Sequence, residues 1–246
     1  MKIIVDYIQT GRRNRPMTNP ASSLYKKIMK PQYITIHNAY SRANAKQLHE
    51  YVKSTGAANR PASWHFSIDE KECYQSLPTN EVGWHAGDNL GPGNTTTIGI
   101  EICDYAMLAR PQNKELFWQA VEHAAKLCAH LIETEPTLKP YPECLKQHHD
   151  WSGKNCPSWI RSQKDGWKDF VSMVGHFLNN KPEPEPLPKV QRRIGIRVDD
   201  KPVTEEGYLI NNGTYVRMAF AMQFAPIKVT GHGDYINIET LDYDLV

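Results

Sequence analysis

The segment from Gln147 to Pro157 constrains this chain most strongly, because it places a histidine and a cysteine where both can bind one metal ion. Its sequence is Gln-His-His-Asp-Trp-Ser-Gly-Lys-Asn-Cys-Pro. His148 and Cys156 stand eight residues apart, and a turn around Gly153 can bring them together. Neutral imidazole and thiolate are side chains that zinc prefers. The segment therefore predicts two ligands of a zinc site.

A third ligand is expected from His37, which ends the run Tyr-Ile-Thr-Ile-His. This alternating, β-branched run predicts a strand over residues 33–37. A structural zinc site is closed by four protein ligands, whereas a catalytic site keeps one position open. Two histidines and one cysteine therefore predict a catalytic site for one Zn²⁺. A lone histidine in a strand is more often simply packed, so the prediction for His37 depends on the other two ligands.

Five short motifs follow one another over about residues 30–178. They are Tyr-Ile-Thr-Ile-His37-Asn, Ser-Trp-His65-Phe-Ser-Ile-Asp, Gly-Trp-His85-Ala-Gly-Asp, Thr-Ile-Gly-Ile-Glu101-Ile-Cys, and His148 to Cys156-Pro157. In this order they resemble the zinc-dependent N-acetylmuramoyl-L-alanine amidases of phage endolysins, relatives of the peptidoglycan recognition proteins. The resemblance implies hydrolysis of the amide bond between N-acetylmuramic acid and the L-alanine of the stem peptide. It points to a phage or prophage endolysin for host cell lysis, with a bacterial autolysin of the same family as the alternative.

The resemblance also implies roles for single residues. It selects His148 over His149 as the ligand, because the family ligand precedes the cysteine by eight residues. It places Glu101 beside the metal as general base and Lys154 opposite the scissile carbonyl, where a cation stabilises the oxyanion. The residues alone leave alternatives open. A carboxylate among isoleucines needs a partner when buried, which leaves a structural salt bridge for Glu101, and a loop lysine is normally solvated.

Four further residues are expected to line the substrate groove: His65, Trp84, His85 and Asn94. An aromatic side chain beside a histidine in a glycine-rich loop, here residues 83–88, can stack on a sugar or hydrogen-bond the stem peptide. Trp84 could equally anchor the core. The segment 88–94, Asp-Asn-Leu-Gly-Pro-Gly-Asn, is expected to form a loop at the rim of the groove.

Strands and amphipathic helices are expected to alternate along the first 180 residues. Apolar residues at helical or alternating spacing predict helices over 43–53, 113–134 and 166–178, and strands over 33–37, 64–68, 73–76 and 96–102. Interleaved elements of this kind predict an α/β fold, with a mixed central sheet flanked by helices. Residues 1–30 are expected to form a solvated polar arm, with a short helix over Ser22–Met29.

The chain is expected to hold two domains. Residues 1–180 form the zinc amidase catalytic domain, and residues 181–189, with prolines at alternate positions, form an extended linker. Residues 190–246 are expected to form a small α+β domain, with strands near 190–198, 207–210, 227–229 and 235–238, a hairpin turn at 211–213 and a helix over 215–224. This part resembles the copper amine oxidase N-terminal-like module. It is predicted to bind cell-wall polymer, and a stabilising or oligomerising appendage is the alternative.

Composition excludes other classes. The net charge of +2 is too small to indicate binding to nucleic acid. The sequence holds no run of about 18 apolar residues, so no segment is predicted to span a membrane. The N-terminus reaches Asp6 before a signal-peptide core is complete, so synthesis in the host cytoplasm is expected, with action on the wall after release. Five cysteines at irregular spacing are expected to stay reduced, because a disulfide framework favours an even number.

Two rival functions come from other classes. A non-catalytic peptidoglycan-binding protein of the same family would lack the cysteine ligand, whereas this chain keeps Cys156. A zinc peptidase cutting the stem peptide would more often carry His-Glu-x-x-His on a helix, a motif that is absent here. The sequence therefore favours the amidase over both.

Overall fold

The structure is a computed structural model that describes residues 2–54, 62–109 and 114–180, together with the backbone of five strands beyond residue 191. By its internal contacts the chain divides into two compact units, Met1–Lys181 and Pro182–Val246. The proline-rich segment 181–189 and most of the helix expected over 215–224 lie outside the described residues.

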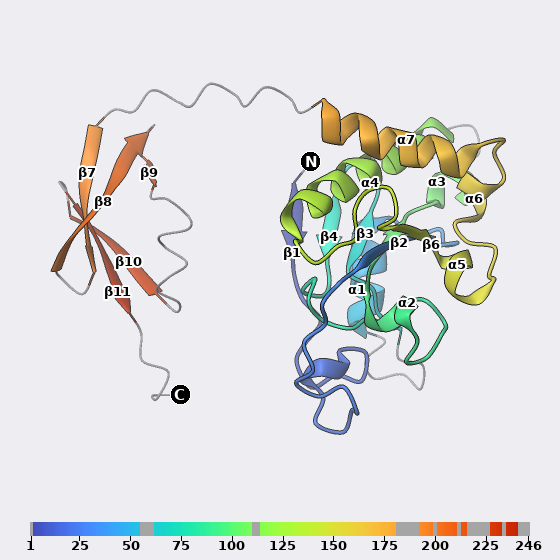
Figure 1. Cartoon of the computed structure of the whole chain (residues 1–246), viewed down its shortest axis with the longest axis horizontal. Helices are drawn as coiled ribbons and strands as arrows, with labels where there is room; N and C mark the ends of the chain where they lie inside the picture. Colours follow the sequence, from blue (N-terminus) through green and yellow to red (C-terminus); the bar gives the residue numbers. More distant parts are fainter. Residues whose placement is uncertain are drawn as a thin grey trace. The chain divides into compact units, whose positions relative to one another are not determined.

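A six-stranded mixed sheet forms the centre of the first unit (Figure 1). Its strands in spatial order are β1 (Ile3–Val5), β4 (Cys73–Gln75), β3 (Phe66–Ile68), β5 (Thr97–Ile102), β2 (Tyr33–Asn38) and β6 (Leu145–Gln147). Strands β3, β5, β2 and β6 run parallel, and β4 is antiparallel to β3. The predicted strands and the mixed sheet flanked by helices are confirmed.

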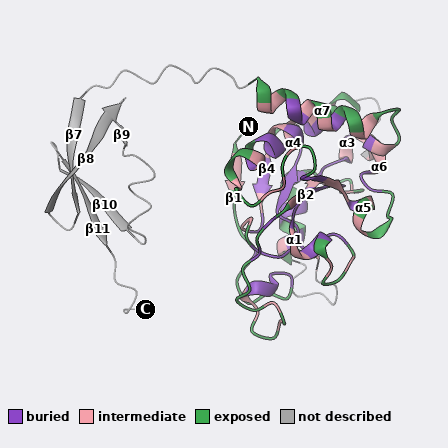
Figure 2. Ribbon diagram, viewed as in Figure 1, coloured by how far each residue is buried: buried purple, intermediate pink, exposed green. Residues whose placement is uncertain are grey.

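Two long helices cover one face of this sheet: α4 (Lys114–Thr134) and α7 (Gly166–Asn179). Alternate residues of β2 and β5 point to that face, because side chains on a strand alternate between faces. They pack with the apolar stripe of the helices in one fully buried core whose members include Ile34, Ile36, Ile98, Ile100, Phe117, Val121, Leu127, Phe170 and Val174. Burying each such side chain stabilises the folded state by roughly 1.5–3 kcal/mol. Most of the buried apolar side chains belong to this cluster (Figure 2).

The opposite face is divided between a small apolar cluster and a polar region. Helix α1 (Ala45–Ser54) packs over β3 and β4 through Leu48 and Val52, beside Trp64 and Tyr74. Over β2 and β5 the same face carries polar side chains and a glycine. The short helices α2 (Pro92–Thr95), α3 (Tyr105–Ala109), α5 (His148–Ser152) and α6 (Ser158–Arg161) lie in connections between the longer elements.

Residues 1–30 are not the solvated arm that their composition predicts. Strand β1 adds to the edge of the sheet beside β4, and Ile8 is fully buried. Arg15 is 9% exposed; it donates two hydrogen bonds to the carboxylate of Glu81 at 2.8 and 2.7 Å and a third to the carbonyl of Ile8. The expectation was wrong because a cation can be buried when it has a partner. The partner of Arg15 is Glu81, which lies 66 residues away in the sequence, so the composition of residues 1–30 does not reveal it.

The short helix expected over Ser22–Met29 is also wrong, since these residues form turns followed by extended chain. The hydroxyl of Ser22 accepts a hydrogen bond from the backbone of Leu24, a local bond that competes with helical pairing. The only helical turn described in this region is a 3₁₀ turn at Pro16–Thr18.

The described part of the second unit is a five-stranded sheet with the order β10-β11-β7-β8-β9. Its strands are β7 (Arg192–Val198), β8 (Lys201–Ile210), β9 (Gly213–Tyr215), β10 (Ile227–His232) and β11 (Tyr235–Thr240). Strands β8 and β9 pair antiparallel with Ile210 opposite Gly213, which confirms the hairpin predicted there. Among the described residues, no helix combines the length and apolarity needed to span a membrane.

The buried ion pair yields a stability prediction. Replacing Arg15 by Met, or Glu81 by Met, should each lower the free energy of unfolding by about 3–5 kcal/mol, because either change leaves one charge buried alone. The double variant should lose less than the sum of the two. All six tryptophans stand before residue 181, so tryptophan fluorescence during urea unfolding reports on the first unit.

The exposed Arg12, whose guanidinium donates to the side chain of Gln9, provides a matched control. Arg12→Met should change the free energy of unfolding by less than about 0.5 kcal/mol. Losses at position 15 no larger than those at position 12 would show that the buried pair does not hold the N-terminal segment in place.

Candidate active site

The candidate site lies where three parallel strands end. His37 on β2 stands directly opposite Glu101 on β5. On the other side of β2, Gln147 pairs with Ile36, and the next residue, His148, opens α5. Because parallel strands end at the same edge of a sheet, these side chains meet there.

The segment after β6 folds back on itself, as the sequence predicted. The backbone amide of Gln147 donates to the carboxylate of Asp150, which fixes the start of α5. Gly153 ends the helix with a φ of 74°, a conformation that glycine adopts without steric cost. The amide of His149 then donates to the carbonyl of Cys156 at 3.0 Å. This bond carries the cysteine back over the first turn of α5.

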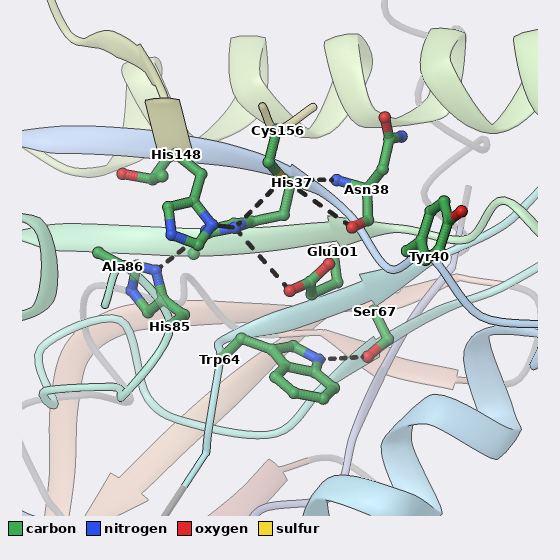
Figure 3. Close-up of polar contacts among 12 residues, drawn as sticks. His37, Asn38, Tyr40, Trp64, Ser67, His85, Ala86, Glu101, His148 and Cys156 are labelled. Atoms are coloured by element: carbon green, nitrogen blue, oxygen red, sulfur yellow. Dashed lines mark hydrogen bonds and ion pairs between the residues drawn. The ribbon is translucent and has the colours of Figure 1, made fainter. Parts of the chain in front are cut away.

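His37, His148 and Cys156 present their ligand atoms to one another (Figure 3). The Nδ1 atoms of the two histidines lie 2.9 Å apart, and Cys156 Sγ lies 3.9 Å from His37 Nδ1. One ligand atom from each residue lies within 4.8 Å of the others, and all three residues are buried. His149 points away, with its side chain 41% exposed and its Nδ1 near the carboxylate of Asp150.

Burial keeps this donor set in the form that binds a metal, except at the thiol. It lowers the pKa of His37 well below its usual value and that of His148 to about 4, so both rings are neutral. It raises the pKa of Cys156 to about 12, and the nearby Glu101 adds to this shift. A thiolate buried here therefore needs a positive partner. Two imidazoles and one thiol around one point suit Zn²⁺ better than a hard cation such as Mg²⁺.

Glu101 is held beside the ligands without a structural partner of its own. Its side chain is 14% exposed, and Oε1 lies 3.9 Å from His37 Nδ1. Oε2 is buried and has no hydrogen-bond partner among the described residues. Burial raises the pKa of Glu101 to about 8, although Lys154 opposes this shift. A structural salt bridge with Lys or Arg, the alternative left open by the sequence, is not found for Glu101 among the described residues.

A cleft of about 350 Å³ opens onto this cluster. It is lined by the three candidate ligands and Glu101, together with Asn38, Ala39, Tyr40, His85, Lys154, Asn155 and Ser158. Lys154 is exposed at the rim. Its charge acts on Glu101 and on both histidines, so it lies where it can face a bound substrate.

Residues 27–159, which contain every feature of this cleft, match the family model described as N-acetylmuramoyl-L-alanine amidase. The chain belongs to this amidase family. Similar proteins of Bacillus subtilis (strain 168) include the amidases XlyA, 36% identical over 71% of this chain and 52% of XlyA, and CwlH, 34% identical over 69% of this chain and 59% of CwlH. The chain thus spans between half and two thirds of the length of these relatives.

Solved structures agree with the amidase fold. The catalytic domain of XlyA is matched over 71% of this chain and 100% of that chain, with 34% identity and a TM-score of 0.56. PlyL is matched over 71% of this chain and 97% of that chain, with 27% identity and a TM-score of 0.58. The fold expected from the motifs is confirmed for the first unit.

Of the four residues expected in the substrate groove, Trp84 alone is more than marginally exposed. It lines a second hollow of about 460 Å³ together with Leu90 and Asn94. His65 is fully buried, and both its ring nitrogens are engaged: Nδ1 accepts from the Gly99 amide, and Nε2 donates to the Glu81 carbonyl. No ring nitrogen of His65 is left for a substrate.

Asn94 and His85 are also turned inward. Asn94 is 3% exposed, and its Oδ1 accepts the backbone amides of both His85 and Ala86 at 2.8 Å. Its amide group donates to the carbonyl of Asn89. The side chain therefore holds the loop in shape. His85 is 9% exposed, and its ring faces His37.

Sequence reasoning missed Tyr40 and Asp104. Tyr40 has a φ of 47° and a side chain exposed at the cleft rim. Its amide, the amide of Ser41 and the indole of Trp159 all donate to the fully buried carboxylate of Asp104. These residues come from three separate segments, so no local pattern reveals the link.

Proposed function

We propose that the protein hydrolyses the amide bond between N-acetylmuramic acid and the L-alanine of the stem peptide, with one Zn²⁺ held by His37, His148 and Cys156. The observation that carries the proposal is the convergence of these three ligand atoms beside Glu101, at the bottom of an open cleft. The relatives named above are amidases of this specificity, which supports the same substrate, bacterial peptidoglycan, for this chain.

Zinc in such a site polarises a carbonyl and makes water more acidic. The residues around it supply the rest. Glu101 accepts a proton from the attacking water and returns it to the alanine nitrogen as the carbon–nitrogen bond breaks. A carboxyl group whose pKa lies near the working pH suits both steps. Lys154 provides positive charge for the oxyanion that forms between them. The products are the free lactyl carboxylate and a peptide with a new alanine amino terminus.

The cell-biological role we propose is lysis of a host by a phage or prophage endolysin, and an autolysin of the same family is the alternative. The structures similar to this chain include a mutant endolysin from Bacillus subtilis, in keeping with the first role. Either role needs the enzyme to reach the wall after synthesis.

The metal site yields a direct prediction. The purified chain should carry one zinc per molecule, and chelation should abolish wall lysis until zinc is returned. Cys156→Ser should lower zinc affinity, because a neutral hydroxyl is a far poorer ligand than a thiolate. Zinc content is measured by atomic emission. Cys128→Ala, which removes a buried thiol from α4, should leave zinc content unchanged. Full activity in a metal-free chain would end the zinc proposal.

Glu101 and Lys154 should affect turnover rather than metal binding. Glu101→Gln should lower kcat roughly 10²–10⁴-fold, as loss of a general base does, and Lys154→Met roughly 10²–10³-fold, as loss of an oxyanion partner does. Both variants should keep their zinc. The assay counts new alanine amino termini released from purified peptidoglycan.

The same assay separates the rival functions. New amino termini inside the stem peptide would indicate a peptidase, and wall binding without any new terminus would indicate a binding protein. A Glu101 variant that loses its zinc would make Glu101 a ligand or a structural residue instead.

We further propose that the second unit binds wall polymer and thereby raises the local concentration of substrate for the first. Its resemblance to the copper amine oxidase N-terminal-like module stays a prediction. The support for independent action is the division of the chain into two compact units, Met1–Lys181 and Pro182–Val246. Every proposed ligand and proton-transfer group lies in the first unit.

A chain ending at Lys181 should therefore fold and cleave soluble muramoyl-peptides at the parental rate. Against intact walls at low enzyme concentration it should be slower than the whole chain. The isolated second unit, residues 187–246, should sediment with walls. If it stays in the supernatant while the shortened chain lyses walls at the parental rate, the second unit has no targeting role.

A further inference from the structure

His37 uses its two ring nitrogens for different purposes. Nδ1 faces the other candidate ligands, His148 and Cys156. Nε2 lies 3.1 Å from Nδ1 of His85 (Figure 3). The two rings stand nearly perpendicular, with an interplanar angle of 89° and centroids 5.1 Å apart, so the edge of one ring meets the other at its nitrogens. His85 therefore contacts a ligand residue directly.

The direction of the hydrogen bond between His37 and His85 follows from the contact that the other ring nitrogen of His85 makes with Thr97. The hydroxyl of Thr97 donates to the carbonyl of Gly93 at 2.5 Å, and it accepts from Thr35. Its one proton is used, so its oxygen can only accept from His85 Nε2, which lies 3.5 Å away. His85 thus carries its proton on Nε2.

The position of the proton on His85 determines which ring nitrogen of His37 carries a proton. With its proton on Nε2, the buried ring of His85, which is 9% exposed, accepts a hydrogen bond at Nδ1. His37 Nε2 must then be the donor, which leaves the lone pair of His37 on Nδ1. That lone pair is directed at the point shared with His148 and Cys156. The chain of bonds selects the tautomer of His37 that can bind a metal through Nδ1.

The ring of His85 sits in a slot made for it. A Cβ atom added at Gly99 would lie 2.8 Å from Cγ and Cδ2 of His85, and one added at Gly83 would lie 3.1 Å from the same Cδ2 atom. Glycine weakens the interior of a strand and often marks a close approach. Gly99 in β5 is such a case. Asn94 fixes the backbone of His85 at the same time.

The second histidine ligand depends on the same loop. The ring of His148 lies against this loop, because a Cβ atom added at Gly87 would lie 3.7 Å from His148 Nε2. The indole of Trp151, on the helix that carries His148, donates to Thr35, which joins the chain ending at Gly93. The loop that carries His85 thus lies beside both histidine ligands.

We propose that His85 is a positioning residue for the metal, which accepts the Nε2 proton of His37 and holds Nδ1 toward the ion, instead of contacting substrate. This inference rests on the proposed zinc site. Outer partners of this kind typically change metal affinity by 10–100-fold when they are removed.

A matched pair of variants separates the two nitrogens of His85. His85→Asn places an amide oxygen at the distance of Nδ1 from the backbone and keeps the acceptor for His37. His85→Gln reaches the position of Nε2 and keeps the contact to Thr97, but it leaves His37 without its acceptor. Zinc affinity of the full chain, measured by competition with a chelator, should fall about 10–100-fold for Gln and stay close to the parental value for Asn.

A measurement on the parental chain is independent of how the variants fold. In the zinc-loaded protein, nitrogen NMR of the histidine rings should show His37 protonated at Nε2 and bound through Nδ1. Opposite assignments in the parent, equal affinities in the Gln variant and the parent, or equal losses in both variants would overturn the positioning role. Failure of the parent to bind zinc would instead overturn the proposed function.

Discussion

The parallel pairing of β2 with β5 is the constraint on which the rest of the site depends. In this register Ile34 and Ile36 lie beside Ile98 and Ile100, while Thr35 lies beside Gly99 and His37 beside Glu101. One set of side chains faces α4 and α7 and supplies the core. The other set faces the cleft. A slip of one residue would exchange the two faces, so the hydrophobic core that stabilises the sheet also fixes the distance between the proposed ligand and the proposed base.

The site gathers groups whose burial is unfavourable in the absence of a cation. Desolvation raises the pKa of both Glu101 and Cys156, and it keeps three neighbouring histidines, His37, His85 and His148, neutral. A polar cluster of this kind destabilises a fold unless its members are paired. Residues at a functional site commonly show such shifted pKa values. The shifted pKa values and the geometry of the candidate ligands therefore support the same conclusion, that this polar cluster is a functional site.

Much of this architecture could be predicted from the sequence. The helix over residues 114–134 and the strands that carry His37 and Glu101 follow from periodicity, and the ligand turn follows from the spacing of His148, Gly153 and Cys156. The inward orientation of His65 and Asn94 could not be predicted, because both have partners far along the chain. A histidine beside a glycine suggests an open loop, whereas Gly83 and Gly99 serve here to admit a buried ring.

The segment before residue 30 shows the same limit and connects it to the site. Composition alone predicts that Arg15 is one more exposed cation, yet its guanidinium binds the carboxylate of Glu81. The carbonyl of Glu81 accepts from His65, whose other nitrogen accepts from the Gly99 amide. Gly99 in turn forms the floor of the slot for His85. Successive hydrogen bonds thus connect the N-terminal segment to Gly99, and the ring of His85 packs against Gly99. Long-range pairs of this kind leave no periodic signal, and here they help to hold the ring of His85 beside the proposed ligand His37.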